Sequence, residues 1–340
     1  MSDKVKFVNA VNDFAKARIA VIGDLMLDVY HFGTVTRISP EAPVPVVSVT
    51  RRTHCLGGAG NVMRNIVSCG GSVHAFGAVG DDQAGREVVS ELQALGVDHS
   101  GIVTDGNKRT TEKCRVIAGS QQMLRLDYED VLPLADDLRK SMVGGVKKLI
   151  GSGAVDAVIF DDYAKGVLTA SMLEEIIAAA GKRRIVTLLD PKPASGGVTT
   201  VKHLTVLKPN RGEAFTLARM RDPGPAANPL QDNALKLAAK KISEEWEPEY
   251  LLISLAAQGM ALFRRGDLLR IIPAMAREVF DVSGAGDTVA AVCTMALACG
   301  CDPVDAAKIA NIAAGVVVGK IGTAPIFKEE LLAAFEHAVK

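Results

Sequence analysis

The sequence predicts an α/β protein with a central, mostly parallel sheet, helices on both faces of that sheet, and a small β lid. Three observations predict this class. Short β-branched runs alternate with longer helical patterns, several of these runs end in a polar residue, and two further β-like regions interrupt the alternation. Alternating strands and helices are typical of a parallel sheet covered by helices. No linker marks a boundary, so we expect residues 1–340 to form a single domain.

The predicted strands are short and largely apolar. They lie at 18–24, 154–162, 184–190, 204–210 and 250–255, and helical segments between them include 58–69, 82–95, 169–180 and 234–245. Four of the strands end in Asp24, Asp162, Asp190 and Asn210. In doubly wound sheets ligands bind at the carboxyl ends of the strands, so we expect these four side chains to meet at one cleft.

Two regions do not follow the alternation. Residues 33–52 contain three prolines within six residues, followed by an alternating β-like run, and residues 113–126 form a second, weaker β region. Proline confines such a strand to the edge of a sheet or to a separate small sheet. We therefore expect these two regions to form the lid over the cleft. The alternative interpretation is two surface hairpins without a role.

The balance of charge excludes some partners. Lysine plus arginine equals aspartate plus glutamate at 39 each, so no overall field attracts nucleic acid or an anionic membrane. The longest nearly apolar stretch, 288–299, is too short to cross a bilayer, and the N-terminus lacks the apolar core of a signal peptide. The six cysteines show no Cys-x-x-Cys spacing and are interpreted as reduced thiols. We expect a cytoplasmic protein that binds neither nucleic acid nor membrane.

A run of small residues and an acid stands where a strand-like run gives way to a helix: Gly284, Ala285, Gly286 and Asp287. Backbone N–H groups at the start of a helix have no intrahelical partner, so those of the first three residues can bind an anion. Asp287 could then accept the proton of an alcohol that attacks phosphorus. The alternative is a capped helix with a tight glycine turn, and this motif alone leaves both interpretations open.

Other designs for binding phosphate are excluded. A Walker loop has four residues between its first glycine and the Gly-Lys-Ser/Thr sequence, whereas residues 315–321 have three and end in isoleucine. A dinucleotide fingerprint should follow the first strand, and none does. The protein-kinase set of motifs is also missing.

Two pairs of residues are candidates for a metal and a sugar. Asn210 and Glu213 are three positions apart at the start of a helix, where both can face a metal or its waters, or can instead cap the helix. Asp24 and Asp28 flank an apolar run and could accept hydrogen bonds from vicinal sugar hydroxyls.

A second glycine-rich junction opens another helix. Gly57 and Gly58 precede Asn61, and their minimal side chains suit a close approach of the backbone and of Asn61 to a ligand.

Taken together, these motifs resemble the ribokinase/phosphofructokinase B family of sugar kinases. The resemblance runs along the whole chain, through Gly23 and Asp24, 57–61, 190–192, Asn210 with Glu213, and 281–288. It implies a ribokinase-like core, ATP as phosphoryl donor, and Mg²⁺ held by Glu213 through water. It also implies that residues 284–286 form an anion hole, that Asp287 is the catalytic base, and that the nucleotide is bound by Lys192, Asn210, Glu213, Ser254, Gly259 and Asn311.

Within that family, the stretches 36–47, 121–127, 161–166 and 311–323 resemble the D-glycero-β-D-manno-heptose-7-phosphate kinases. This resemblance implies transfer of a phosphoryl group to the anomeric hydroxyl of that sugar phosphate, a step toward ADP-heptose and the lipopolysaccharide core. It implies sugar contacts from Asp24, Asp28, Gly57, Gly58, Asn61 and Asp162, and cations for the distal phosphate from Arg115, Arg125 and Lys165, with Lys113 and Lys192 in reserve. Another acceptor, or a sensor without activity, remains the alternative.

Four further points complete the prediction. The loop 253–260 departs from the family pattern, because Ala256 stands where glycine is usual. The chain has no room for the nucleotidyltransferase domain fused to many such kinases, so a stand-alone kinase is expected. Family analogy leaves open a monovalent cation near Asp281 and Ser283. Residues 44–50 would expose a strand edge, so we expect a homodimer through the lids.

Overall fold

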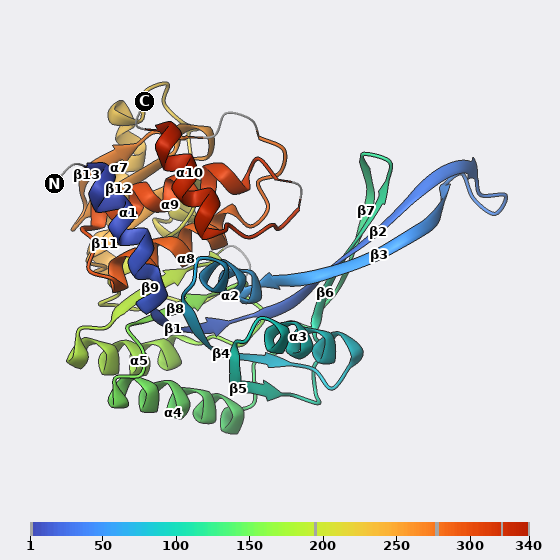
Figure 1. Cartoon of the computed structure of the whole chain (residues 1–340), viewed down its shortest axis with the longest axis horizontal. Helices are drawn as coiled ribbons and strands as arrows, with labels where there is room; N and C mark the ends of the chain where they lie inside the picture. The colour runs from blue at the N-terminus through green and yellow to red at the C-terminus, as the bar shows by residue number, and fades with distance from the viewer. Residues whose placement is uncertain (1–2, 194–195, 276–278, 321, 339–340) are drawn as a thin grey trace.

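The computed structural model describes residues 3–193, 196–275, 279–320 and 322–338 (Figure 1). Parts of the predicted domain 1–340 and of the stretch 311–323, including Ile321, therefore lie outside the described residues. The chain begins with α1 (Asp3–Asp13) and ends with α10 (Lys328–Ala338). Both terminal helices pack on the same side of the molecule in Figure 1, where they contact each other.

A nine-stranded sheet forms the centre, in the order β13-β12-β11-β10-β9-β8-β1-β4-β5. Its strands are β1 (Arg18–Gly23), β4 (Ser72–Val79), β5 (Asp98–Thr104), β8 (Ala157–Asp161), β9 (Val186–Asp190), β10 (Val206–Leu207), β11 (Tyr250–Ser254), β12 (Met260–Arg264) and β13 (Asp267–Ile272). The pairs from β5 to β11 are parallel, whereas β12 and β13 form an antiparallel end. The predicted parallel α/β sheet is confirmed.

The predicted strand 204–210 is shorter in the structure. β10 contains only Val206 and Leu207, and Pro209 follows two residues later. Proline has no N–H to donate to a neighbouring strand, so regular pairing ends before it.

Helices cover both faces of the large sheet. One face carries α1, α2 (Ala59–Ser68), α3 (Gln83–Ala94), α8 (Ala285–Ala298), α9 (Pro303–Val317) and α10; the other carries α4 (Asp136–Ser152), α5 (Ala170–Arg183), α6 (Arg211–Leu217) and α7 (Asn233–Trp246). Single-turn 3₁₀ helices lie at Phe14–Lys16, Pro229–Gln231 and Ala256–Gln258. Side chains alternate along each strand, so in β8 Ile159 packs in one core and Phe160 in the other.

A second sheet of four strands projects from the main body, in the order β3-β2-β6-β7 (Figure 1). Its strands are β2 (Leu25–Ile38), β3 (Pro45–Gly58), β6 (Thr111–Ala118) and β7 (Gln121–Tyr128). It contains the regions 33–52 and 113–126 that the sequence assigned to the lid, and we call it the lid sheet. Pro45 is the first residue of the edge strand β3, a position where a missing N–H is tolerated.

One buried asparagine ties α2 to α8. Asn65 donates through Nδ2 to the carbonyl of Asn61, 2.8 Å away. Its Oδ1 accepts hydrogen bonds from Thr288 Oγ1 at 3.1 Å and from the backbone N–H of Ile326 at 3.0 Å. This cross-link fixes the two helices whose first turns carry Asn61 and Asp287.

The six cysteines are free thiols in the structure, and Cys69, Cys114 and Cys293 are buried. Within the described ranges, every helix is too short or too polar to cross a bilayer.

Candidate active site

A cavity of about 820 Å³ opens at the carboxyl edge of the large sheet. Asp162, Asp190 and Asn210 line it, together with the first turn of α8. Three of the four polar strand ends predicted to converge therefore share one cleft. Asp24, the fourth, is 1% exposed and lies beneath it.

The carboxylate of Asp24 holds the loop that follows β8. It accepts hydrogen bonds from the backbone N–H groups of Tyr163 at 2.9 Å, Lys165 at 3.0 Å and Val167 at 3.3 Å. Two of these hydrogen bonds go to Oδ2 and one to Oδ1, so the carboxylate keeps capacity to accept another hydrogen bond. Its sugar-binding role stays a prediction, and the structure also gives Asp24 a positioning role.

The carboxylate of Asp162 also accepts hydrogen bonds from backbone N–H groups. Its two oxygens accept hydrogen bonds from the N–H groups of Ala164, at 2.9 Å, and Val198, at 2.6 Å. Burial raises the pKa of this carboxyl to about 6. Asp162 lines the cavity, but its carboxylate oxygens are hydrogen-bonded to the backbone of the loops that contain Ala164 and Val198.

Asp287 lies in the first turn of α8 and is 4% exposed. Its Oδ2 accepts a hydrogen bond from Asn61 Nδ2 at 2.7 Å, and its Oδ1 accepts one from the Tyr163 hydroxyl at 2.9 Å. Burial raises the pKa of Asp287 to about 6; the hydrogen bond from Asn61 opposes this shift, and the charge of Asp190 adds to it. A carboxyl with this pKa is mostly ionised at neutral pH and can still accept a proton readily.

Two further acids and a lysine surround Asp287. Carboxylate oxygens of Asp161, Asp190 and Asp287 lie within 4.8 Å of one another. Lys208, which is 3% exposed, places its Nζ 2.7 Å from Asp190 Oδ2. The pairing with Asp190 raises the pKa of Lys208 against the opposing effect of burial, so this lysine is charged.

The glycines at the start of α8 keep space open beside this cluster. Gly284 has a φ of +79°, and a Cβ built on it would lie 2.6 Å from Asn61 Nδ2. A Cβ on Gly286 would point toward Lys208 Nζ, 3.6 Å away. Ala285, the middle residue of the predicted anion hole, donates its N–H to the carbonyl of Val282 at 3.3 Å. The open space, the helix N-terminus and the buried ammonium together suit a phosphoryl group.

Asn210 and Glu213 form a reciprocal cap on α6. Asn210 Oδ1 accepts from the N–H of Glu213, and Glu213 Oε2 accepts from the N–H of Asn210, both at 2.9 Å. The capping interpretation is confirmed, and the metal role of Glu213 stays a prediction. Lys192 lies on the cavity wall, where its Nζ is 3.0 Å from Glu213 Oε1. It therefore lies apart from Arg115 and Arg125 of the lid sheet, the cations predicted to bind the distal phosphate.

The other predicted nucleotide residues line the same cavity, namely Ser254, Gly259 and Asn311. Asn311 donates through Nδ2 to the carbonyl of Pro273 at 2.7 Å. Gly259 has a φ of +89°, and a Cβ there would strike the carbonyl oxygen of Ile272. The rest of the wall includes the apolar side chains of Met275, Val279, Val282 and Val318.

The predicted cations are each paired with an acid. Arg115 and Arg125 lie on the lid sheet, and Lys165 lies in the loop after β8. Arg115 Nη1 lies 2.6 Å from Asp28 Oδ1. Arg125 makes two hydrogen bonds to Asp127, at 2.8 and 2.9 Å. Asp28 is 4% exposed, so this pair with Arg115 is nearly buried at the foot of the sheet.

Glu129 joins two more of these cations. Its Oε2 lies 2.8 Å from Lys165 Nζ and 3.6 Å from Lys113 Nζ, and Lys113 also lies 3.4 Å from Asp127. The structure thus brings Lys113, Lys165 and Arg125 together through two carboxylates.

The glycines before α2 allow close packing against Asp24 and Asp28, at the end of the lid sheet that joins the large sheet. A Cβ on Gly57 would lie 2.7 Å from Asp28 Oδ2. Gly58 has a φ of +54°, and a Cβ there would lie 2.5 Å from the carbonyl oxygen of Asp24. Asn61, four residues after Gly57, points instead to Asp287 and is fully buried.

Asp281 is held by backbone groups. Its two oxygens accept from the N–H of Ser283 at 2.8 Å and of Gly322 at 3.1 Å. The monovalent cation near Asp281 and Ser283 stays a prediction.

Sequence reasoning missed three residues of this site. Lys208, Tyr163 and Asp161 contact or surround Asp287, although the fragments that contain them had been noted. A lysine directly after an apolar strand was the available signal for Lys208, because an ammonium at that position faces the carboxyl edge of the sheet.

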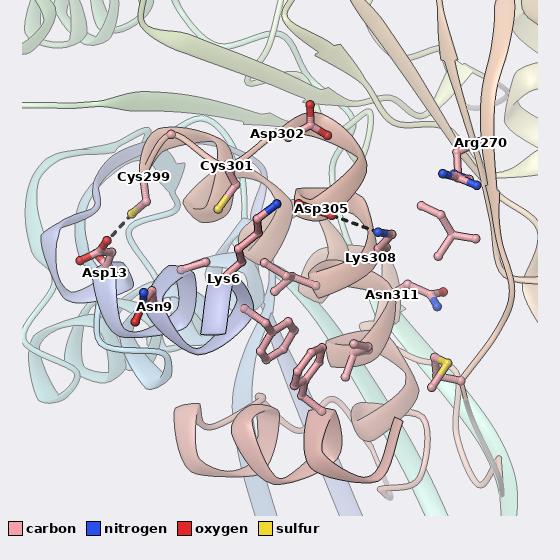
Figure 2. Close-up of a pocket in the computed structure, with 18 of the residues that line it drawn as sticks. Lys6, Asn9, Asp13, Arg270, Cys299, Cys301, Asp302, Asp305, Lys308 and Asn311 are labelled. Carbon is pink, nitrogen blue, oxygen red and sulfur yellow. Dashed lines mark hydrogen bonds and ion pairs between the residues drawn. The ribbon is translucent and has the colours of Figure 1, made fainter. Parts of the chain in front are cut away.

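A second cavity of about 830 Å³ lies among α1, β13, α9 and α10 (Figure 2). It shares Met275 and Asn311 with the first cavity. Figure 2 shows the pairs Asp13 with Cys299 and Asp305 with Lys308 at its wall. Of the site residues predicted from the sequence, Asn311 lines this cavity. The first cavity is the better candidate because it contains the cluster of buried acids and the start of α8.

Comparison with known proteins gives a family match. The model of the pfkB family carbohydrate kinases matches residues 16–330. The bifunctional protein HldE of Caulobacter sp. (strain K31) is 44% identical over 336 residues, covering 96% of this chain and 64% of the relative. The bifunctional protein HldE of Geobacter sulfurreducens is 41% identical over 321 residues, covering 93% and 63%. The chain thus spans less than two thirds of the length of these relatives.

Solved structures share the fold. Arabidopsis thaliana ribokinase, complexed with ribose and ATP, superposes with a TM-score of 0.67 at 18% identity, covering 94% of this chain and 99% of that one. Escherichia coli phosphofructokinase-2, in complex with potassium, superposes with a TM-score of 0.72 at 19% identity, covering 95% and 99%. The predicted ribokinase-like fold is confirmed.

We expect Gly284→Ala to destabilise the protein more than Gly300→Ala, by about 1 to 3 kcal/mol. Both glycines have positive φ, of +79° and +83°, but only the Cβ at Gly284 meets another group, the Asn61 amide. Urea unfolding of the two variants isolates this steric contribution from the backbone cost that they share. Equal losses of stability in the two variants would show that the Asn61 side chain moves away from the added Cβ at no cost in free energy.

Proposed function

We propose, from the premise that this chain belongs to the pfkB family of carbohydrate kinases, that its acceptor is D-glycero-β-D-manno-heptose 7-phosphate and that Asp287 is its general base. Membership of the family makes the chain an ATP-dependent sugar kinase. The acceptor rests on the four stretches that resemble the heptose-phosphate kinases. The observation that carries the base is the position of Asp287, buried beside the open turn at Gly284 and Gly286.

In the proposed reaction, the anomeric oxygen of the sugar forms a bond to the γ-phosphorus of ATP. The bond from that phosphorus to the β–γ bridging oxygen breaks, and ADP leaves. The proton of the hydroxyl passes to Asp287. The products are ADP and the 1,7-bisphosphate.

The residues beside Asp287 fit the donor. ATP supplies the phosphoryl group, and Mg²⁺ bound to its phosphates compensates their charge. Gly286 leaves room for a phosphoryl oxygen next to Lys208, and the N-terminus of α8 adds partial positive charge. Lys192 with Glu213, and the apolar wall with Met275, would bind the rest of the nucleotide.

Asn61 and Tyr163 hold the carboxylate of Asp287 in one orientation. Each donates to a different carboxylate oxygen, so the orientation of the group is fixed. Both oxygens keep a second lone pair, because a carboxylate oxygen accepts more than one hydrogen bond. Asp287 can therefore accept the sugar proton without releasing either donor.

The lid sheet offers a site for the distal phosphate of the acceptor. Lys113, Lys165 and Arg125 are close together because Asp127 and Glu129 neutralise them. A phosphate dianion would compete with these two carboxylates for the same ammonium and guanidinium groups. Asp28, held by Arg115, lies on the side of the sheet that carries these cations and would accept from sugar hydroxyls.

We expect Asp287→Asn to lower turnover by at least about a hundredfold, since general bases contribute 10²- to 10⁴-fold. The change keeps the shape of the side chain and removes its basicity. The measurement is ADP release with D-glycero-D-manno-heptose 7-phosphate, sedoheptulose 7-phosphate, fructose 6-phosphate, ribose and adenosine as acceptors. Thermal stabilisation by ATP should persist in the variant. Turnover with ribose or adenosine in place of the heptose phosphate would refute the proposed acceptor, and stabilisation without any turnover in the wild type would favour a sensor.

We expect kcat/KM of the wild type to fall as the pH drops through about 6, because this ratio reports the pKa values of the free enzyme and protonation of Asp287 removes the base. The hydrogen bond from Tyr163 lowers the pKa of Asp287, so Tyr163→Phe should move this acidic limb to higher pH. Tyr128→Phe, at an exposed tyrosine of the lid sheet, is the matched control and should leave the limb in place. A limb that moves to lower pH in Tyr163→Phe would contradict the assignment.

The homodimer expected from the sequence belongs to the same proposal. The strand register places Arg115 and Arg125 on one face of the lid sheet, so Leu124 and Leu126 lie on the opposite face. These leucines are 45% and 43% exposed, and Val49 of β3 is 52% exposed. Exposed apolar side chains on a projecting sheet favour pairing with a second copy.

We expect sedimentation velocity at micromolar concentration to show a dimer, and Leu126→Lys to shift it to monomer. An ammonium in the middle of an apolar contact costs desolvation on both subunits. Val131→Lys is the control, because Val131 is 57% exposed but lies outside the four strands. A monomeric wild type would rule out the dimer.

A further inference from the structure

Three carboxyl groups from separate elements meet beside the start of α8. Asp161 ends β8, Asp190 ends β9, and Asp287 is in the first turn of α8. The parallel register pairs Asp161 directly with Asp190, so the sheet itself sets these two acids side by side. One oxygen from each of the three lies within 4.8 Å of the others.

Asp161 differs from its buried neighbours in having no partner. It is 1% exposed, and among the described residues neither of its carboxylate oxygens has a hydrogen-bond partner. By contrast, Asp24 accepts three backbone hydrogen bonds and Asp162 accepts two. Burying a polar group without a partner is costly, so such a group calls for an explanation, and an absent ion is one.

The local charge also favours a cation. Among the described residues, Lys208 is the one ammonium that pairs with any of the three acids, through Asp190 at 2.7 Å. Burial and the charges of Asp287 and Asp190 raise the pKa of the Asp161 carboxyl well above its usual range, and a cation bound to its oxygens would favour the ionised form. With all three carboxyl groups ionised and Lys208 charged, the cluster would carry two excess negative charges, which a single divalent cation would balance.

We propose that Asp161, Asp190 and Asp287 bind one divalent cation directly, in the absence of nucleotide. Only oxygen ligands are present, and such a set suits Mg²⁺, Mn²⁺ or Ca²⁺ rather than a metal that prefers nitrogen or sulfur. Ligands at about 2.1 to 2.4 Å from one ion can be separated by at most about 4.2 to 4.8 Å. The three carboxylate oxygens lie within 4.8 Å of one another, so a single ion can reach all three after small movements of the side chains.

This site is separate from the water-mediated metal contact expected at Glu213, whose oxygens are used by Lys192 and by the backbone of Asn210. The inference goes beyond the proposed function because it concerns the free protein. It does not depend on which sugar is the acceptor. Asp161 provides its sharpest test, because within the described part of the chain its carboxylate oxygens make no hydrogen bond that a substitution could remove.

The experiment measures Mn²⁺ binding to the whole chain without nucleotide, by electron paramagnetic resonance and by isothermal titration. The wild type should bind one Mn²⁺, and Asp161→Asn should weaken that binding at least tenfold. Glu213→Gln should bind Mn²⁺ as the wild type does. Asp81→Asn, at an acid that is 80% exposed, controls for weak surface binding.

Thermal unfolding provides a second readout in case Asp161→Asn is less stable. Mn²⁺ should raise the melting temperature of the wild type and leave that of Asp161→Asn unchanged. Lack of Mn²⁺ binding by the wild type, or equal binding by Asp161→Asn, would overturn the inference. Loss of binding in Glu213→Gln alone would also overturn it and place the ion at the cap of α6. A kinase assay that identifies another acceptor would leave it intact.

Discussion

The hydrogen bond between Asn61 and Asp287 joins the two helix N-termini on which the candidate site depends. Asn61 is in the first turn of α2 and Asp287 in the first turn of α8, and their side chains meet at 2.7 Å. One turn further along α2, Asn65 bonds Thr288 and repeats the connection. Both glycine-rich junctions are therefore fixed relative to each other, although 226 positions of sequence separate the bonded residues.

The acids around this bond are kept buried in different ways. Backbone N–H groups surround Asp24 and Asp162, an ammonium pairs with Asp190, and side-chain donors hold Asp287. Hydrogen bonds and ion pairs offset the desolvation of a charge only when they contact it directly. Each carboxyl at the edge of the sheet therefore has its own set of partners. The pKa of Asp162 and that of Asp287 are both raised to about 6, and Asp287 is the one of the two beside the open turn.

The local patterns in the sequence predicted much of this fold. Alternation predicted the parallel sheet, the prolines predicted the lid sheet, and the run from Gly284 to Asp287 predicted the helix N-terminus at the cleft. The antiparallel strands β12 and β13, and β4 and β5 at the other side, were not predicted, because short apolar runs do not reveal which strand they pair with. Tyr163 and Lys208 were missed for a similar reason. Their contacts with Asp287 and Asp190 arise from tertiary packing, and no spacing along the chain records them.

Asp24 is the single residue between β1 and β2, so it stands between the large sheet and the lid sheet. Its side chain binds the loop that carries Tyr163, and Tyr163 in turn contacts Asp287. A rotation of the lid sheet must change backbone torsion angles at or next to Asp24. Such a hinge would transmit the rotation through the loop to the tyrosine hydroxyl. A change at the lid sheet would then alter the proton affinity of Asp287, although Asp287 lies on α8 and outside that sheet.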